Sequence, residues 1–179
     1  ISVWVYSIYT SGNNSRTIFS NRHSTSNYGF TLYAPSYDRS ENKASIKFRE
    51  HSDAEMYTSS DSIETDKWFH ITYTHKTNEQ TIYLNGVQNV QETNSRSFTQ
   101  TPGTPQIGRE RSIYYFNGKL SDFRIYNRAL TADEIKTVYN SKLNDNKFNK
   151  AIFYNGEIVN SSTYTDTNTV NKEPILFDT

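Results

Sequence analysis

The chain has 179 residues, enough for one sizeable domain, and its 19 Lys and Arg balance its 19 Asp and Glu to a formal net charge of zero. This balance removes the positive field by which nucleic-acid-binding proteins collect phosphates and other proteins attach to anionic membranes, and no apolar run approaches the roughly 20 residues of a membrane-spanning helix. Cysteine is absent, which excludes disulfides, thiolate metal sites and a cysteine nucleophile, while an aromatic content of 15% argues against disorder.

Strands are predicted from short segments rich in β-branched and aromatic residues, separated by polar turns. Apolar and polar side chains alternate with a period of two in residues 46–49 and 69–73, which is typical of half-buried strands. The same period places Phe123 and Ile125 on one face. Many such strands indicate an all-β sandwich or barrel. The expected strands span residues 1–9, 17–22, 29–34, 45–52, 56–63, 68–75, 81–84, 87–92, 105–108 and 120–126.

Three Asn-Gly pairs mark turns between these segments. The pairs at 85–86 and 155–156 are each flanked by apolar runs, and Asn-Gly readily takes the two positive φ angles of a type I′ hairpin turn. The pair at 117–118 leads into the last predicted strand. Hairpins are the favoured interpretation for the first two pairs, with ordinary loops as the alternative.

One helix is predicted after the last of these strands. Thr131 and Glu134 have the spacing of a capping box, and Leu130 and Ile135 have that of a hydrophobic staple. Ile135 then shares a helix face with the apolar residues at 138 and 139. The helix should begin after Thr131 and end near residue 141 or 142. A polar connector, one hairpin and a Thr-rich tail follow it.

Six segments of the chain carry motifs that, in the same order, are found in a known family of domains. They are residues 1–6, 18–20, 28–33, 66–74, 81–87 and 116–135, the last reading Phe-Asn-Gly-Lys-Leu-Ser-Asp-Phe-Arg-Ile-Tyr-Asn-Arg-Ala-Leu-Thr-Ala-Asp-Glu-Ile. Their succession resembles the laminin-G-like, concanavalin A-like jelly-roll domains over residues 1–142. The last segment is the most specific, because it is similar to the family's final strand and short capping helix.

The resemblance implies the fold class and the domain limits. We expect a two-sheet antiparallel β-sandwich (jelly roll) with one short C-terminal helix over residues 1–142, and a connector with a hairpin and a polar tail over 143–179. The family's first strand is missing, so the N-terminal edge should be completed by upstream sequence, by the hairpin at 152–159 or by a neighbouring chain. The residues expected in the core are Trp4, Phe19, Leu32, Phe48, Phe69, Ile71, Leu84, Phe123 and Ile125.

Because the same architecture hosts glycoside hydrolases, carboxylate pairs bear on function. Retaining enzymes need two carboxyl groups about 5 to 5.5 Å apart. The expected Glu-x-Asp-x-x-Glu pattern begins with Glu64 and Asp66 but has Phe69 in place of the last acid. We therefore predict a solvated turn here and no enzymatic activity. His70 and His75 face opposite sides of one strand and cannot chelate one metal together, and His70 should point to solvent or to a neighbouring strand.

Calcium is the ion that the resemblance implies, bound by carboxylates and carbonyls of rim loops. The candidates are Asp38, Asp53 and Asp122, with surface acids or turn formers as the favoured interpretation. Ser121 stands where many relatives carry an acidic residue, which counts further against calcium. No other cofactor is expected.

The best candidate for recognition is the loop at residues 109–116, which joins two strands and carries three aromatic residues and two arginines. Sugars are bound by stacking on aromatic rings, with polar groups satisfying their hydroxyls. In the alternative, the side chains at 113, 115 and 116 anchor the loop to the core and Tyr114 is the freest. The residues predicted to bind a ligand are Arg109, Arg111, Tyr114 and Tyr115.

Three functions follow, in order of preference. The first is a non-enzymatic carbohydrate-binding or adhesion module of a larger extracellular or virion-surface protein, such as a phage-like tail or capsid fibre, with a cell-surface glycan as partner. The second is a purely structural module that contacts neighbouring subunits of a larger, oligomeric assembly. The third is a glycoside hydrolase-like enzyme. Residues 121–124 resemble copies from phage and prophage tail proteins. Because the chain begins at Ile1, inside an apolar stretch, we expect a fragment or a processed product.

Overall fold

The fold is described from a computed structural model. For residues 34–38, 43–50, 55, 57, 142–143, 150–154 and 157–158 the structure describes the backbone alone. The structure describes residues 1–8, 17–22, 29–38, 43–50, 55–58, 63, 67–93, 103–110, 114–143, 150–154 and 157–158.

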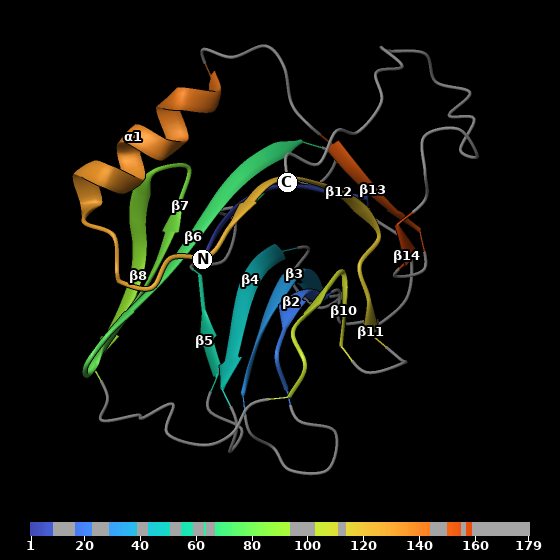
Figure 1. The fold of residues 1–179 in the computed structure, drawn as a ribbon, viewed down its shortest axis with the longest axis horizontal. Coiled ribbons are helices and arrows are strands. Elements are labelled where there is room, and N and C mark those ends of the chain that lie inside the picture. The colour runs from blue at the N-terminus through green and yellow to red at the C-terminus, as the bar shows by residue number, and fades with distance from the viewer. Residues whose placement is uncertain are drawn as a thin grey trace.

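Two antiparallel sheets face one another, as the sequence predicts (Figure 1). In spatial order, the larger sheet consists of β14 (Glu157–Ile158), β13 (Lys150–Tyr154), β12 (Gly118–Arg124), β1 (Ser2–Ser7), β6 (Trp68–Lys76), β7 (Glu79–Leu84) and β8 (Val87–Thr93). The smaller sheet consists of β5 (Glu55–Tyr57), β4 (Lys43–Glu50), β3 (Phe30–Asp38), β2 (Thr17–Ser20) and β9 (Gln106–Ile107). A separate ribbon pairs β10 (Arg109–Glu110) with β11 (Tyr114–Tyr115).

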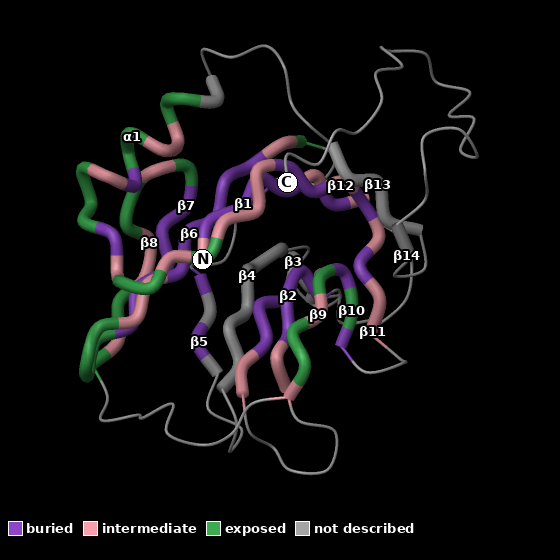
Figure 2. The backbone as a smooth tube through the Cα atoms, viewed as in Figure 1, coloured by how far each residue is buried: buried purple, intermediate pink, exposed green. Residues whose placement is uncertain are grey.

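The main core lies between the two sheets. Val3 and Val5 of β1 point into it together with Phe69 and Ile71 of β6, because alternate residues of a strand share a face. Figure 2 shows buried positions running through β1, β6 and β12 and exposed positions along β8 and α1. Of the predicted core residues, those confirmed as buried are Trp4, Phe19, Leu32, Phe69, Ile71 and Leu84.

Three predicted core residues need separate comment. Phe123 is half-buried and packs against the core. The prediction for Ile125 is wrong, because this side chain is 62% exposed. Strand β12 ends at Arg124, so the alternation that places Phe123 inward does not continue to Ile125. The side chain of Phe48 lies outside the described residues.

The hairpin after the helix extends the larger sheet. Strand β13 pairs with β12, with Lys119 opposite Ile152, and β14 pairs with β13. Strand β1 lies between β12 and β6, so it is not at an edge. The hairpin therefore does not cover an edge of β1 but adds two strands to the larger sheet beyond β12.

The predicted Asn-Gly hairpin turn is confirmed at residues 85–86. Asn85 and Gly86 have φ angles of 51° and 78°, as a type I′ turn requires, and they join β7 to β8. Asn155 and Gly156 lie outside the described residues, but β13 and β14 pair on either side of them. Strand β12 begins at Gly118, immediately after Asn117.

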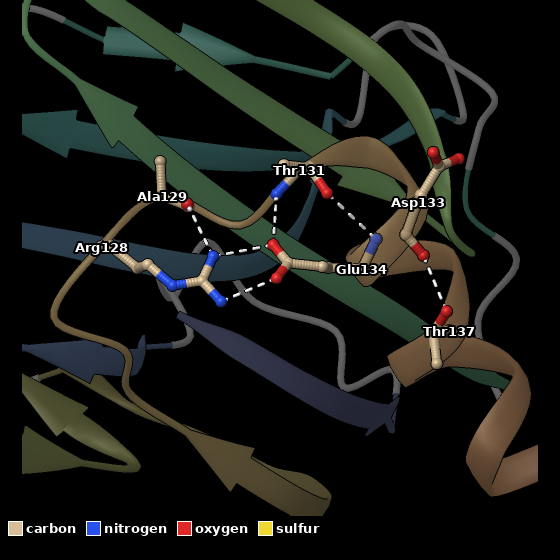
Figure 3. A network of polar contacts seen from close by, with 6 residues as sticks. All are labelled: Arg128, Ala129, Thr131, Asp133, Glu134 and Thr137. Atoms are coloured by element: carbon tan, nitrogen blue, oxygen red, sulfur yellow. Dashed lines mark hydrogen bonds and ion pairs between the residues drawn. The ribbon is translucent and has the colours of Figure 1, made fainter.

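Helix α1 spans Ala132–Leu143 and covers part of the outer face of the larger sheet, on the side of β7 and β8 (Figure 1). Its start is the predicted capping box: the Glu134 amide donates to Thr131 Oγ1 at 3.3 Å, and the Thr131 amide donates to Glu134 Oε2 at 2.9 Å (Figure 3). Leu130 and Ile135 are buried in one cluster with Tyr83, so the staple is confirmed as well. No helix in the described residues has the length and apolar character that crossing a membrane requires.

An exposed ion pair reinforces this start. The two terminal guanidinium nitrogens of Arg128, Nη1 and Nη2, donate to the Glu134 carboxylate, each at 2.7 Å (Figure 3). Hydrogen bonding to Arg128 is the largest cause that lowers the pKa of Glu134 to about 2, and the hydrogen bond from the Thr131 amide is the second largest. The carboxylate is therefore ionised at neutral pH and placed at the positive end of the helix.

Candidate functional site

The predicted recognition loop forms the two-stranded ribbon of β10 and β11. Arg109 lies opposite Tyr115, and Glu110 lies opposite Tyr114. Residues directly opposite in an antiparallel pair share a face. The ribbon therefore has one face with Arg109 and Tyr115 and another with Glu110 and Tyr114.

Glu110 fixes the inner face of the ribbon to the sandwich. Its side chain is fully buried, and its carboxylate accepts hydrogen bonds from Arg22 at 2.9 Å and from the Tyr33 hydroxyl at 2.5 Å. A buried carboxylate is tolerated only when it is paired and hydrogen-bonded in this way. The contact ties β10 to the end of β2 and to β3, so the ribbon is held firmly at one end of the molecule.

The backbone and Phe116 complete the attachment. The Gly108 amide donates to the Ile18 carbonyl at 2.9 Å, and the Phe116 amide donates to the Gly108 carbonyl at 2.8 Å. Phe116 is fully buried in the main core, in agreement with the anchoring role considered for it. Sequence reasoning missed Glu110, because nothing in the local pattern distinguishes a buried acid from an exposed one between two arginines.

The outer face of the ribbon presents a cation next to an aromatic ring. Arg109 is exposed, and its side chain makes no ion pair or hydrogen bond within the described part of the chain. Tyr115 is half-buried, as is Tyr114 on the opposite face. Arg111 lies outside the described residues. The structure thus brings Arg109 and Tyr115 together on a rigidly attached ribbon.

A second notable cluster lies on the outer face of the larger sheet. We call Ser121, Trp4 and His70 the covered row, because they lie side by side on β12, β1 and β6 and are all buried. Tyr139 of α1 stacks on Trp4 with ring centroids 5.4 Å apart and an interplanar angle of 18°. The helix therefore shields this row from solvent.

His70 in the covered row is a neutral structural residue. It faces away from Phe69 and Ile71, as predicted, toward the neighbouring strand β1, where Ser2 Oγ lies 2.8 Å from its Nε2. It does not reach solvent, since Trp4 and Tyr139 lie against it. Burial is the main cause that lowers the pKa of His70 to about 4.

Among the acidic candidates, the structure describes the side chain of Asp122. Asp122 accepts a hydrogen bond from Arg124 Nε at 2.8 Å, which is the main cause of a raised pKa of Arg124. No group of three potential His, Cys, Asp or Glu ligands gathers in that part of the chain. Phe69, at the position of the missing acid, points into the core. The side chains of Asp38, Asp53, Glu64 and Asp66 lie outside the described residues.

The sequence and the fold together match a known family. Residues 1–136 match the laminin-G-type profile of the concanavalin A-like lectin/glucanases superfamily. The chain belongs to this superfamily. A search of curated proteins found no match.

Solved structures share the fold of this concanavalin A-like domain at low sequence identity. A native heptameric SAP-like pentraxin from Limulus polyphemus is 20% identical with a TM-score of 0.59, over 77% of this chain and 68% of the pentraxin. The CBM40 domain of the Ruminococcus gnavus IT-sialidase, bound to α2,3-sialyllactose, is 13% identical with a TM-score of 0.57, over 77% and 81%.

A third similar structure is domain 4 of AbnA, a GH43 extracellular arabinanase from Geobacillus stearothermophilus, in complex with arabinotriose. It is 17% identical with a TM-score of 0.54, over 77% of this chain and 64% of that one. The chain thus spans about two thirds of the pentraxin and of the arabinanase domain, and only 36% of a further match. At these identities the likeness establishes the fold.

Proposed function

We propose that the chain is a non-enzymatic carbohydrate-binding module of a larger extracellular protein, and that the outer face of the β10–β11 ribbon binds the sugar. The observation that carries the proposal is the exposed Arg109 opposite Tyr115, on a ribbon that Glu110 holds to the sandwich. A tyrosine ring offers an apolar surface to the C–H face of a sugar, and a guanidinium offers donors to its hydroxyl or carboxylate oxygens. Fixing the ribbon beforehand lowers the entropic cost of binding.

The absence of catalysis is proposed from the placement of the carboxylates. Glu110 is enclosed between Arg22 and Tyr33, so it is not available to protonate a glycosidic oxygen or to attack a sugar. Phe69 replaces the acid expected in the glycosidase pattern and is turned into the core. The two similar structures with bound oligosaccharides are the CBM40 domain of a sialidase and domain 4 of an arabinanase, which supports a binding role.

The proposed context of the larger protein is a cell or virion surface, including adhesion to glycans through a tail or capsid fibre. It rests on the resemblance of residues 121–124 to phage and prophage tail proteins. The complete sequence of the parent protein tests it: flanking fibre or baseplate segments are expected, and flanking intracellular enzyme domains would contradict it.

A purely structural module is the second candidate. Strand β8 ends the larger sheet, is largely exposed and has no strand paired on its outer side within the described residues, so a neighbouring subunit could pair with it. The similar pentraxin is itself a heptamer. Light scattering decides this alternative: it requires a stable oligomer together with no detectable glycan binding.

Isothermal titration with the glycans that bind on an array tests the main proposal. We expect Arg109→Gln and Tyr115→Ala each to weaken binding by about tenfold or more, as loss of a charged hydrogen bond or a stacking surface does. Tyr115→Phe should retain binding, because it keeps the ring. The matched control is Lys136→Gln, which removes an exposed cation of α1 and should leave the affinity unchanged.

Two further measurements test the absence of catalysis and the absence of a calcium requirement. Mass spectrometry of the recovered sugar should show it intact, and cleavage would contradict a non-enzymatic role. Titration with EDTA should give the same affinity as titration with calcium, because the Asp122 carboxylate is held by Arg124. A loss of affinity in EDTA would instead support bound calcium, for which Asp53 and Asp122 are the predicted ligands. If Lys136→Gln weakens binding as much as Arg109→Gln does, the ribbon is not the site.

A further inference from the structure

Three side chains form a second row on the outer face of the larger sheet. We call Lys119 of β12, Tyr6 of β1 and Trp68 of β6 the open row. Tyr6 lies opposite Lys119 on one side and opposite Trp68 on the other, so the three side chains share a face. Their neighbours in sequence, among them Val5 and Leu120, point into the core on the other side.

The open row lies one register step from the covered row, on the same three strands. Tyr139 stacks on the covered row, and every side chain of the open row is half-buried. The Tyr6 and Trp68 rings have centroids 5.7 Å apart at an angle of 59°, and Lys119 Nζ lies 5.3 Å from the centroid of the Tyr6 ring. The row thus combines two ring surfaces with an ammonium group.

We infer that the open row is a second binding site and that it takes one or two sugar rings. Aromatic rings present the apolar surface on which a pyranose ring stacks, and the Lys119 ammonium can donate to a hydroxyl or a sugar carboxylate at its edge. Three adjacent strands span about 10 Å, which matches one or two sugar rings. A row of three side chains is far smaller than the roughly 20 to 30 residues per side of a stable protein interface. The side chains stand on strands rather than on loops, so the site is formed in advance.

The site is separate from the ribbon but lies near it along the chain. Tyr115 of the ribbon and Lys119 of the open row are four positions apart in the sequence, a span of at most about 14 Å. The inference needs neither Arg109 nor Glu110, so it can hold or fail independently of the proposed ribbon site. The experiment must therefore report on each surface by itself.

The two tryptophans of the chain provide such a report. Trp4 is 3% exposed beneath Tyr139, whereas Trp68 is half-buried in the open row, so acrylamide should quench mainly Trp68 fluorescence. The probes are cellotetraose, chitotetraose and α2,3-sialyllactose. We expect at least one of them to protect the intact chain from acrylamide in a saturable manner. Protection should vanish in Trp68→Phe, in which only Trp4 emits.

Matched variants show which surface holds the sugar that protects Trp68. Lys119→Gln should weaken the protecting sugar by about tenfold, the size of a lost charged hydrogen bond, and Lys136→Gln should not. Arg109→Gln and Tyr115→Ala should leave the protection of Trp68 in place. If these two ribbon variants lose calorimetric binding while no sugar protects Trp68, the ribbon site stands and the open row is overturned.

The opposite outcomes are equally distinct. Protection of Trp68 that depends on Lys119, together with ribbon variants that bind as the wild type does, would support the open row and overturn the ribbon. Protection that survives Lys119→Gln and persists in Trp68→Phe would show that it arises elsewhere and would overturn the inference. Absence of both protection and calorimetric binding would overturn both sites.

Discussion

Two neighbouring rows of side chains on the same three strands differ in how far they are buried. The covered row of Ser121, Trp4 and His70 lies under α1, where Tyr139 stacks on Trp4. The open row of Lys119, Tyr6 and Trp68 is one register step away and half-buried. Trp4 of the covered row packs against Tyr139 of the helix, whereas Trp68 of the open row is half-buried and is the proposed contact for a sugar.

The difference is set by how the helix is held. Its start is fixed by the capping box and by burial of Leu130 and Ile135, and Gly86 in the β7–β8 turn allows Tyr139 to approach. Substitutions in the covered row, in the β7–β8 turn and at the start of α1 should therefore lower the stability by different amounts.

Replacing Trp4 with Ala should destabilise the protein most. The change removes a buried ring that contacts Tyr139 and His70, and such substitutions cost about 3 to 5 kcal/mol. For a chain of this size the melting temperature should fall by roughly 10 °C or more. Trp68→Ala should cost about 1 kcal/mol, because its ring is already partly solvated. Equal losses in thermal unfolding would contradict the contrast between the rows.

Acid should weaken the covered row through His70. Burial lowers the folded-state pKa of His70 from 6.5 to about 4, so between these values the unfolded chain takes up a proton that the folded chain does not. The free energy of unfolding should therefore fall by up to about 3 kcal/mol as the pH drops from 6.5 to 4. Urea titrations of wild type and His70→Gln measure it, and identical pH slopes would contradict the assignment.

Gly86→Ala should loosen the helix from the sheet. The φ angle of 78° costs a residue with a Cβ about 1 to 2 kcal/mol, and the added carbon would meet Tyr139 Cδ1 at 3.0 Å. Denaturant titrations of Gly86→Ala, Tyr139→Ala and the double variant separate the two causes. We expect Gly86→Ala to cost less when Tyr139 is already Ala. A cost that does not change would show that the backbone strain acts alone.

Thr131→Ala should have the smallest effect. It removes the acceptor of the Glu134 amide, and loss of such a cap costs about 1 kcal/mol. Thermal unfolding should shift modestly, while sugar binding at the ribbon remains as in the wild type. If binding is lost and the melting temperature is unchanged, the helix start itself belongs to the binding surface.

Local patterns predicted much of the fold. The capping box, the staple and the Asn85-Gly86 turn depend on residues within a few positions of each other, and all three are confirmed. The alternation of apolar residues located most of the strands. It failed at Ile125, because a period of two does not reveal where a strand ends.

The candidate sites were less predictable. The loop at 109–116 was identified from its composition, but the pairing of Arg109 with Tyr115 depends on the ribbon register, and the anchoring of Glu110 depends on Arg22 and Tyr33 far away in the sequence. The open row arises from the order of β12, β1 and β6 in the sheet. Such contacts between distant strands leave no local signal in a single sequence.

The most direct test of the account is calorimetric titration of the intact chain with array-identified oligosaccharides, followed by mass spectrometry of the sugar. The account predicts saturable binding, which Arg109→Gln weakens by about tenfold and Lys136→Gln leaves unchanged. It also predicts that the recovered sugar is intact. No binding of any glycan, or cleavage of the bound one, would contradict the central claim that this concanavalin A-like domain is a non-enzymatic carbohydrate-binding module.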